Sequence, residues 1–103
     1  MTAVIEYEVE LEVDEDVAAA FRDWLAGHVR DMLALPGFVS AACRRVLDPP
    51  PAPGRIVLCV RYALVDRDAL ADYLAGPAAG MRAQGQARFG GRFRARRRVL
   101  EPV

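Results

Sequence analysis

The stretch EYEVELEV, residues 6–13, alternates acidic and hydrophobic side chains along its whole length. A period of two is typical of a β-strand that buries one face and leaves the other open. The alternation also specifies the register, because a slip by one residue would bury four carboxylates. The expected buried face comprises Ile5, Tyr7, Val9, Leu11 and Val13, and the expected open face comprises Glu6, Glu8, Glu10 and Glu12.

A helix is predicted directly after this strand, from an N-cap at Asp14 to about Leu35, where Pro36 and Gly37 end it. Residues 38–48 and 55–65 are predicted to form the next two strands. The connector DPPPAPG between them is too rich in proline to continue either strand. The apolar stripe of the helix comprises Val17, Phe21, Trp24, Leu25, His28 and Met32.

The second half of the chain repeats this organisation. Asp66 is predicted to cap a second helix, which is interrupted at Gly76-Pro77, and residues 92–100 are predicted to form the last strand. An internal repeat supports the order, since VDED (13–16) resembles VDRD (65–68) and DWLAG (23–27) resembles DYLAG (72–76). The fold class predicted is α+β: a ferredoxin-like β-α-β-β-α-β sandwich, with an antiparallel-type four-stranded sheet and two helices on one face. One domain over residues 1–103 is expected.

The last strand, RFRARRRVL, carries charges complementary to those of the first. We expect the first and third strands to be central and parallel, and the fourth to pair antiparallel with the first. Arginines 92, 94, 96 and 98 would then lie beside the four glutamates, with Arg97 on the other face as an exception. Opposite charges about 5 Å apart across two strands contribute roughly 0.2–1 kcal/mol per pair. The open face should also carry Val57, Cys59 and Arg61.

Composition excludes several kinds of chemistry. All fourteen basic residues are arginine, so neither a lysine Schiff base nor a P-loop lysine is present. Cys43 and Cys59 lack CxxC spacing and His28 is the only histidine, so we expect no metal site and no cofactor. There is no apolar run of about 20 residues and no secretory signal, so the expected location is the cytoplasm, without a membrane partner.

The segment RFRARRR (92–98) also resembles a nucleic-acid-binding stripe, and RNA-recognition modules share the predicted order of elements. Those modules carry stacking aromatics and basic residues on the first and third strands. Here the first strand presents glutamates, and the third, RIVLCVRYA (55–63), lacks an RNP motif. We therefore expect no nucleic acid as a partner.

Several motifs resemble those of the dimeric α/β-barrel superfamily, which includes the antibiotic-biosynthesis monooxygenase-like domains. They are LPGFVSA after the first helix and the strand-to-helix segment VRYALVDRDALADYL. More narrowly, WLAGHVRDMLALPGF and RFGGRFRARRRVLEP resemble a small bacterial family of unknown function. The resemblance implies a homodimer whose sheets face each other, with ligand cavities between sheet and helices or inside the barrel. The Asn, Trp and His set of haem-degrading relatives is not carried over, because the chain has no Asn.

The candidate site is built around His28, which lies in the apolar stripe of the first helix. His28 is the predicted catalytic proton acceptor and Tyr62 the predicted catalytic hydroxyl, with a small organic ligand bound by Trp24, Tyr7, Phe21 and Met32. The expected function is cofactor-free monooxygenase or isomerase activity. The alternative is a non-enzymatic dimeric binding or regulatory module, in which His28 is a neutral core residue bonded to a tyrosine or a backbone carbonyl.

Two further features have open interpretations. Cys43 and Cys59 lie on neighbouring strands of a hairpin, and the register decides whether they meet; free thiols packed as small hydrophobes are expected. Arg82, Arg88 and Gly90-Gly91 precede the last strand and could hold an anion, or form a solvated turn and a bulge.

Overall fold

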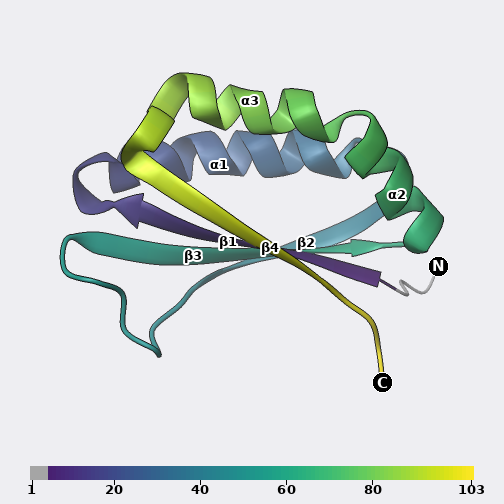
Figure 1. Cartoon of the computed structure of the whole chain (residues 1–103), viewed down its shortest axis with the longest axis horizontal. Helices are drawn as coiled ribbons and strands as arrows, with labels where there is room; N and C mark the ends of the chain where they lie inside the picture. Colours follow the sequence, from purple (N-terminus) through teal and green to yellow (C-terminus); the bar gives the residue numbers. More distant parts are fainter. Residues whose placement is uncertain (1–4) are drawn as a thin grey trace.

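The computed structural model describes residues 5–103 and has the predicted order of elements (Figure 1). The second helix is split at Gly76-Pro77, as the sequence predicted. In chain order the elements are β1 (Ile5–Asp14), η1 (Glu15–Val17), α1 (Ala18–Leu33), β2 (Phe38–Arg45), β3 (Arg55–Leu64), α2 (Arg67–Ala75), α3 (Ala78–Phe89), η2 (Gly90–Arg92) and β4 (Phe93–Leu100).

The four strands form one antiparallel sheet in the order β2-β3-β1-β4. The prediction that the first and third strands run parallel was wrong, since β1 pairs with β3 antiparallel and Tyr7 lies opposite Tyr62. The cause is the hairpin between β2 and β3. It reverses the chain once, so the strand inserted between β1 and β2 runs opposite to both.

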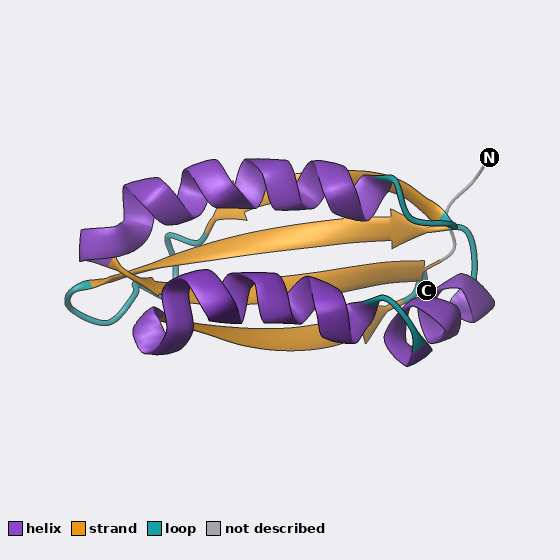
Figure 2. Ribbon diagram, turned by 90° about the horizontal axis from the view of Figure 1, so that it is seen from above, coloured by secondary structure: helices purple, strands orange, loops and turns teal. Residues whose placement is uncertain are grey.

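The helices cover one face of the sheet and leave the other open (Figures 1 and 2). Alternate residues of β1 and β3 point into this two-layer core, as the period of two predicts. Phe21 and Met32 come from α1 and Leu70 and Tyr73 from α2, and all four are buried. None of the helices in residues 5–103 is long and apolar enough to cross a membrane.

Gly37 makes the tight connection between α1 and β2 possible. Its φ is +82°, a left-handed conformation that favours glycine. A Cβ at this position would also lie 2.4 Å from the Cβ of Ala69 on α2. At the start of α2, the predicted cap is confirmed, because the backbone N–H of Ala69 donates to Asp66 Oδ1 at 2.8 Å.

The predicted ladder of opposite charges between β4 and β1 is present for three of the four arginines. Arginines 98, 96 and 94 lie opposite glutamates 8, 10 and 12, whereas Glu6 lies opposite Leu100 and the fourth predicted arginine, Arg92, lies in η2 and pairs with Asp14. The ladder also extends to β3, since Arg61 contacts Glu8 at 2.7 Å and Arg55 contacts Glu12 at 2.9 Å. Residues 57, 59 and 61 share the open face with the glutamates, as expected.

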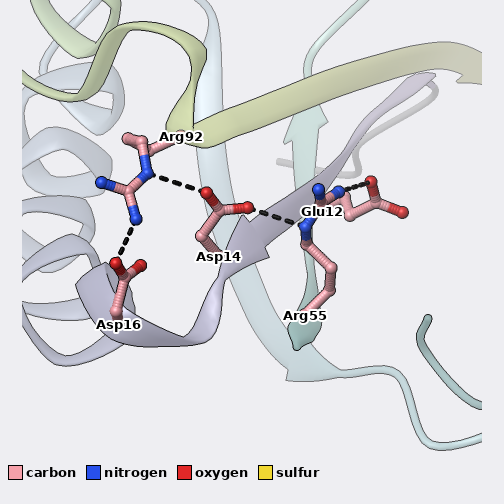
Figure 3. A network of polar contacts seen from close by, with 5 residues as sticks. All are labelled: Glu12, Asp14, Asp16, Arg55 and Arg92. Atoms are coloured by element: carbon pink, nitrogen blue, oxygen red, sulfur yellow. Dashed lines mark hydrogen bonds and ion pairs between the residues drawn. The ribbon is translucent and has the colours of Figure 1, made fainter. Parts of the chain in front are cut away.

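Asp14 does not cap a helix as predicted. A 3-10 turn separates it from α1, and its side chain accepts no backbone hydrogen bond there. Figure 3 shows its carboxylate between Arg92, at 2.8 Å, and Arg55, at 2.7 Å. Arg92 also pairs with Asp16, so this network links the ends of β1, β3 and β4. The hydrogen bond from Arg92 lowers the pKa of Asp14.

Glu8 differs from the other glutamates because its side chain is buried, with a relative exposure of 8%. It accepts hydrogen bonds from Arg98 and Arg61, which lower its pKa more than burial raises it. We expect Glu8→Gln to lower the free energy of unfolding by about 1.5–3 kcal/mol at pH 7, the usual range for a hydrogen bond to a charged group. Urea unfolding measures this quantity.

The matched control for this prediction is Glu10→Gln, because Glu10 meets Arg96 only at 4.0 Å and Arg96 is 86% exposed. The Glu10→Gln change should lower the free energy of unfolding by less than about 0.5 kcal/mol. Because the folded pKa of Glu8 is lowered, its contribution is present above the usual 4.5 and is lost as the pH falls through the folded value. Equal costs for the two variants, or a Glu8 pKa that NMR titration of the folded protein places at or above 4.5, would contradict this account.

Candidate functional site

A small cavity lies between the helix-facing side of the sheet and helices α1 and α3. Its volume is about 50 Å³, which is room for a few water molecules. Five of the six predicted site residues line it: Tyr7, Trp24, His28, Met32 and Tyr62. The cavity therefore brings together predicted side chains from three elements, β1, α1 and β3.

Phe21 is the predicted residue that does not line the cavity. It has no exposed surface and lies behind the cavity wall, with ring centroids 5.5 Å from Trp24, 5.0 Å from Phe89 and 5.1 Å from Phe93. Phe21 thus holds Trp24 in position. Gly85 of α3 lies on the other side of Trp24, where a Cβ would come within 2.9 Å of the indole. The absence of a side chain at Gly85 lets α3 approach α1 closely.

His28 stacks on Trp24, one helical turn earlier, with ring centroids 4.6 Å apart and an interplanar angle of 22°. Its Nδ1 atom is buried and has no hydrogen-bond partner among the residues that the structure describes. The bond to a tyrosine or a carbonyl that the packed-core alternative expects is therefore absent at Nδ1. Burial lowers the pKa of His28, although Asp31 and Gln84 oppose the shift. The imidazole is neutral at pH 7.

Three tyrosine rings adjoin the cavity. Tyr7 and Tyr62 stack at 6.3 Å from their opposite positions on β1 and β3, and Tyr73 of α2 meets Tyr7 edge-on at 5.9 Å. Burial raises the pKa of both Tyr62 and Tyr73 above the usual 10, so their hydroxyls stay protonated at neutral pH. The Tyr7 hydroxyl accepts a hydrogen bond from Arg82 of α3 at 3.0 Å.

Sequence reasoning did not assign Tyr73, Arg82 or Arg97 to this cavity, although all three line it. The internal repeat carried a signal for Tyr73, because DYLAG aligns it with Trp24 of DWLAG. Arg97 was the exception to the alternation of the last strand, and its place opposite Val9 puts it on the helix-facing side. Among residues 5–103, no carboxylate lines the cavity.

The two cysteines are on opposite faces of the sheet. Cys43 lies opposite Val60, on the helix-facing side, whereas Cys59 lies opposite Arg44 and Glu10 on the open face. Both are free thiols, and burial raises the pKa of each. Within residues 5–103, no group of three His, Cys, Asp or Glu side chains is placed to hold a metal ion.

The family is shown by sequence. A family model described as a domain of unknown function (DUF4286) matches residues 4–103. The chain belongs to this family. No match to a curated protein was found.

Solved structures confirm the fold that the sequence resemblance implied. A proposed antibiotic biosynthesis monooxygenase from Deinococcus radiodurans is similar with a TM-score of 0.71 and 14% identity, over 96% of this chain and 92% of that one. SnoaB, a cofactor-independent oxygenase from Streptomyces nogalater, is similar with a TM-score of 0.66 and 19% identity, over 98% of this chain and 95% of that one. A dimeric ferredoxin-like protein from an uncultured marine organism is similar with a TM-score of 0.64 and 12% identity, over 99% of this chain and 97% of that one. At such low identities the likeness shows the ferredoxin-like fold alone.

The neutral state of His28 is directly testable, because it is the only histidine in the chain. NMR titration of its ring should give a pKa below the usual 6.5. The unfolded chain then binds more protons than the folded one just below pH 6.5, so the free energy of unfolding should fall as the pH decreases from 6.5 to the folded value. His28→Gln should abolish this part of the pH dependence. A pKa at or above 6.5, or an unchanged profile in the variant, would contradict the burial argument.

Proposed function

We propose that the protein binds a small organic carbon acid beside His28 and catalyses its enolisation without a cofactor, as the first step of isomerase or monooxygenase chemistry. The observation that supports this is the presence, in one cavity, of a neutral imidazole with an unpartnered buried nitrogen and of tyrosine hydroxyls that stay protonated. A neutral imidazole can accept a proton, and a protonated phenol can donate a hydrogen bond to a developing oxyanion.

In the proposed step, His28 removes a proton from the carbon next to a carbonyl group. The electron pair of the broken C–H bond moves into the enolate, whose oxygen receives a hydrogen bond from the Tyr62 hydroxyl. Where a second double bond is conjugated with the enolate, return of the proton to a different carbon completes an isomerisation. Where the deprotonated carbon carries a second hydrogen, the enolate can instead react with O₂, which forms a C–O bond and takes the proton from His28 to give a hydroperoxide. Loss of water from the hydroperoxide, with that second hydrogen, leaves a carbonyl and reduces the second oxygen atom to water. The stacked Trp24 ring fixes the orientation of the imidazole.

A homodimer is part of the proposal. It draws support from the similar protein described as dimeric, and from the open face of the sheet, where acidic and basic side chains alternate and suit a second copy of the same face. This ion-paired face also supports the expectation that nucleic acid is not a partner, since phosphates would meet glutamates beside the arginines. The cytoplasmic location remains a prediction.

The small volume of the cavity favours the second candidate, a non-enzymatic dimeric binding or regulatory module. An enclosed space of about 50 Å³ is a third of the roughly 150 Å³ that admits benzene in an engineered apolar cavity. A ring-sized ligand would therefore need α3 to shift outward. The break at Gly76-Pro77, where α3 is joined to α2, is a place where such a movement can occur.

Hydrogen–deuterium exchange tests the proposed chemistry even when the final product has not been identified. Enolisable ketones and oxo acids are incubated with the protein in D₂O, and loss of the α-proton signal is followed by NMR, with O₂ uptake recorded in parallel. We expect the protein to accelerate exchange for at least one compound, with a rate that falls on acidification through the pKa of His28. His28→Gln should lose about 10²–10⁴-fold of the acceleration, as expected for removal of a general base. Equal exchange by wild type and variant would contradict the assignment, and absence of exchange would favour the binding module.

Light scattering tests the dimer. Arg94 forms no ion pair within residues 5–103 and Arg96 only a long one, so the double variant Arg94→Glu, Arg96→Glu should leave the protomer folded. We expect a dimer for the wild type and dissociation in the variant, because two acidic faces would repel each other. The control is Arg22→Glu, Arg30→Glu on the exposed side of α1, which should remain dimeric. A wild type that is monomeric at every salt concentration would contradict this part of the proposal.

A further inference from the structure

Two arginines stand where the cavity reaches solvent. Arg82 of α3 and Arg97 of β4 line the cavity and are also exposed residues, so they mark its mouth. Their elements belong to opposite layers, with α3 above the sheet and β4 at its edge. A group at the mouth would therefore meet one guanidinium from the helix layer and the other from the sheet.

The positive charge at the mouth is not neutralised by the protein. Several arginines of the open face pair with acidic residues, among them Arg61 and Arg98, but neither Arg82 nor Arg97 forms an ion pair within residues 5–103. The part of the chain that the structure describes contributes no carboxylate to the cavity lining. Both guanidinium groups lie close enough to Tyr73 to lower the pKa of its hydroxyl, against the larger effect of burial. The two positive charges thus converge on one side of the cavity.

The volume limits what else can bind. The enclosed part holds only a few heavy atoms, whereas the mouth is open and charged. A ligand that fits both parts has a compact uncharged body and one anionic end. Planar carboxylates match the fork geometry of guanidinium groups, and a carbonyl on the body would face the tyrosine hydroxyls.

We propose that the ligand is a small planar oxo acid whose carboxylate binds between Arg82 and Arg97 and whose carbonyl-bearing body reaches Tyr7, Tyr62 and His28. This inference rests on the proposed function, since it names the substrate class of the same cavity. Arg82 and Arg97 are the residues that select the anion. Tyr7 is oriented for the ligand by the hydrogen bond that it accepts from Arg82.

The test compares pyruvate with its uncharged amide, pyruvamide, which has the same shape without the negative charge. Binding is followed by NMR on the indole N–H of Trp24, the only tryptophan in the chain, which lines the cavity and stacks on His28. We expect pyruvate to bind at least tenfold more tightly than pyruvamide, and its affinity to fall with added salt. Arg97→Gln should weaken pyruvate binding by roughly tenfold and leave pyruvamide binding unchanged, as expected for loss of a charge-assisted hydrogen bond. Arg82→Gln also removes the hydrogen bond to Tyr7, so it should weaken the binding of both compounds, and that of pyruvate by roughly tenfold more than that of pyruvamide.

Arg94→Gln is the matched control, since it removes one charge from the same strand on the opposite face and should not alter pyruvate binding. Equal binding of pyruvate and pyruvamide would overturn the anionic class while leaving the cavity as the ligand site. Pyruvate binding that depends on Arg94 and not on Arg97 would place the anion on the open face and overturn the inference. No perturbation of Trp24 by either compound would count against both proposals. Selective pyruvate binding without His28-dependent exchange would leave the anion site standing and remove the proposed chemistry.

Discussion

The alternation of glutamates along β1 is the constraint on which the rest of the structure depends. β1 lies between β3 and β4, so each register error on it would propagate to two neighbouring strands. A slip by one residue would place four carboxylates beneath the helices without partners, and burial of an unpaired charge costs several kcal/mol. Most individual ion pairs of the ladder are exposed and contribute little to stability. Their main effect is to exclude other registers.

Two carboxylates of β1, those of Glu8 and Asp14, each contact arginines from two different segments of the chain. Glu8 lies between Arg61 of β3 and Arg98 of β4, and Asp14 lies between Arg55 of β3 and Arg92 of η2, the turn that leads into β4. The two carboxylates lie six positions apart, Glu8 within β1 and Asp14 at its end. Together they fix the relative twist and offset of three strands. That offset places Tyr7 opposite Tyr62 on the other face, and so brings the tyrosines together at the cavity.

The features that could be predicted from the sequence are those encoded by local signals, and the features that could not are those that depend on contacts between distant segments. The alternation and the acidic cap at Asp66 are local signals, so the order of elements and the faces of the strands followed from them. The direction of β1 relative to β3 and the rung on which each arginine lies depend on non-local pairing, which a single strand does not encode. Asp14 was misassigned for a related reason: two arginines from distant strands compete for the carboxylate that would otherwise cap the helix. For the site, the apolar stripe of α1 identified His28 and Trp24. Tyr73 and Arg97 depend on how α2 and β4 dock, although the internal repeat and the break in alternation marked both positions.

β4 carries arginines on both faces of the sheet, and the charge that surrounds them differs between the two faces. On the open face, glutamates of β1 lie opposite the arginines, so the local charge is nearly balanced. On the helix-facing side, Arg97 lies opposite Val9, and nothing in the lining of the cavity offsets it or Arg82. Burial disfavours a second proton on His28, against the opposing effects of Asp31 and Gln84. A carboxylate bound as proposed would add a negative charge to the cavity, so the imidazolium formed by proton abstraction would cost less in the complex than in the free protein. The cavity would then favour general-base chemistry on an anionic ligand over the same chemistry on a neutral one.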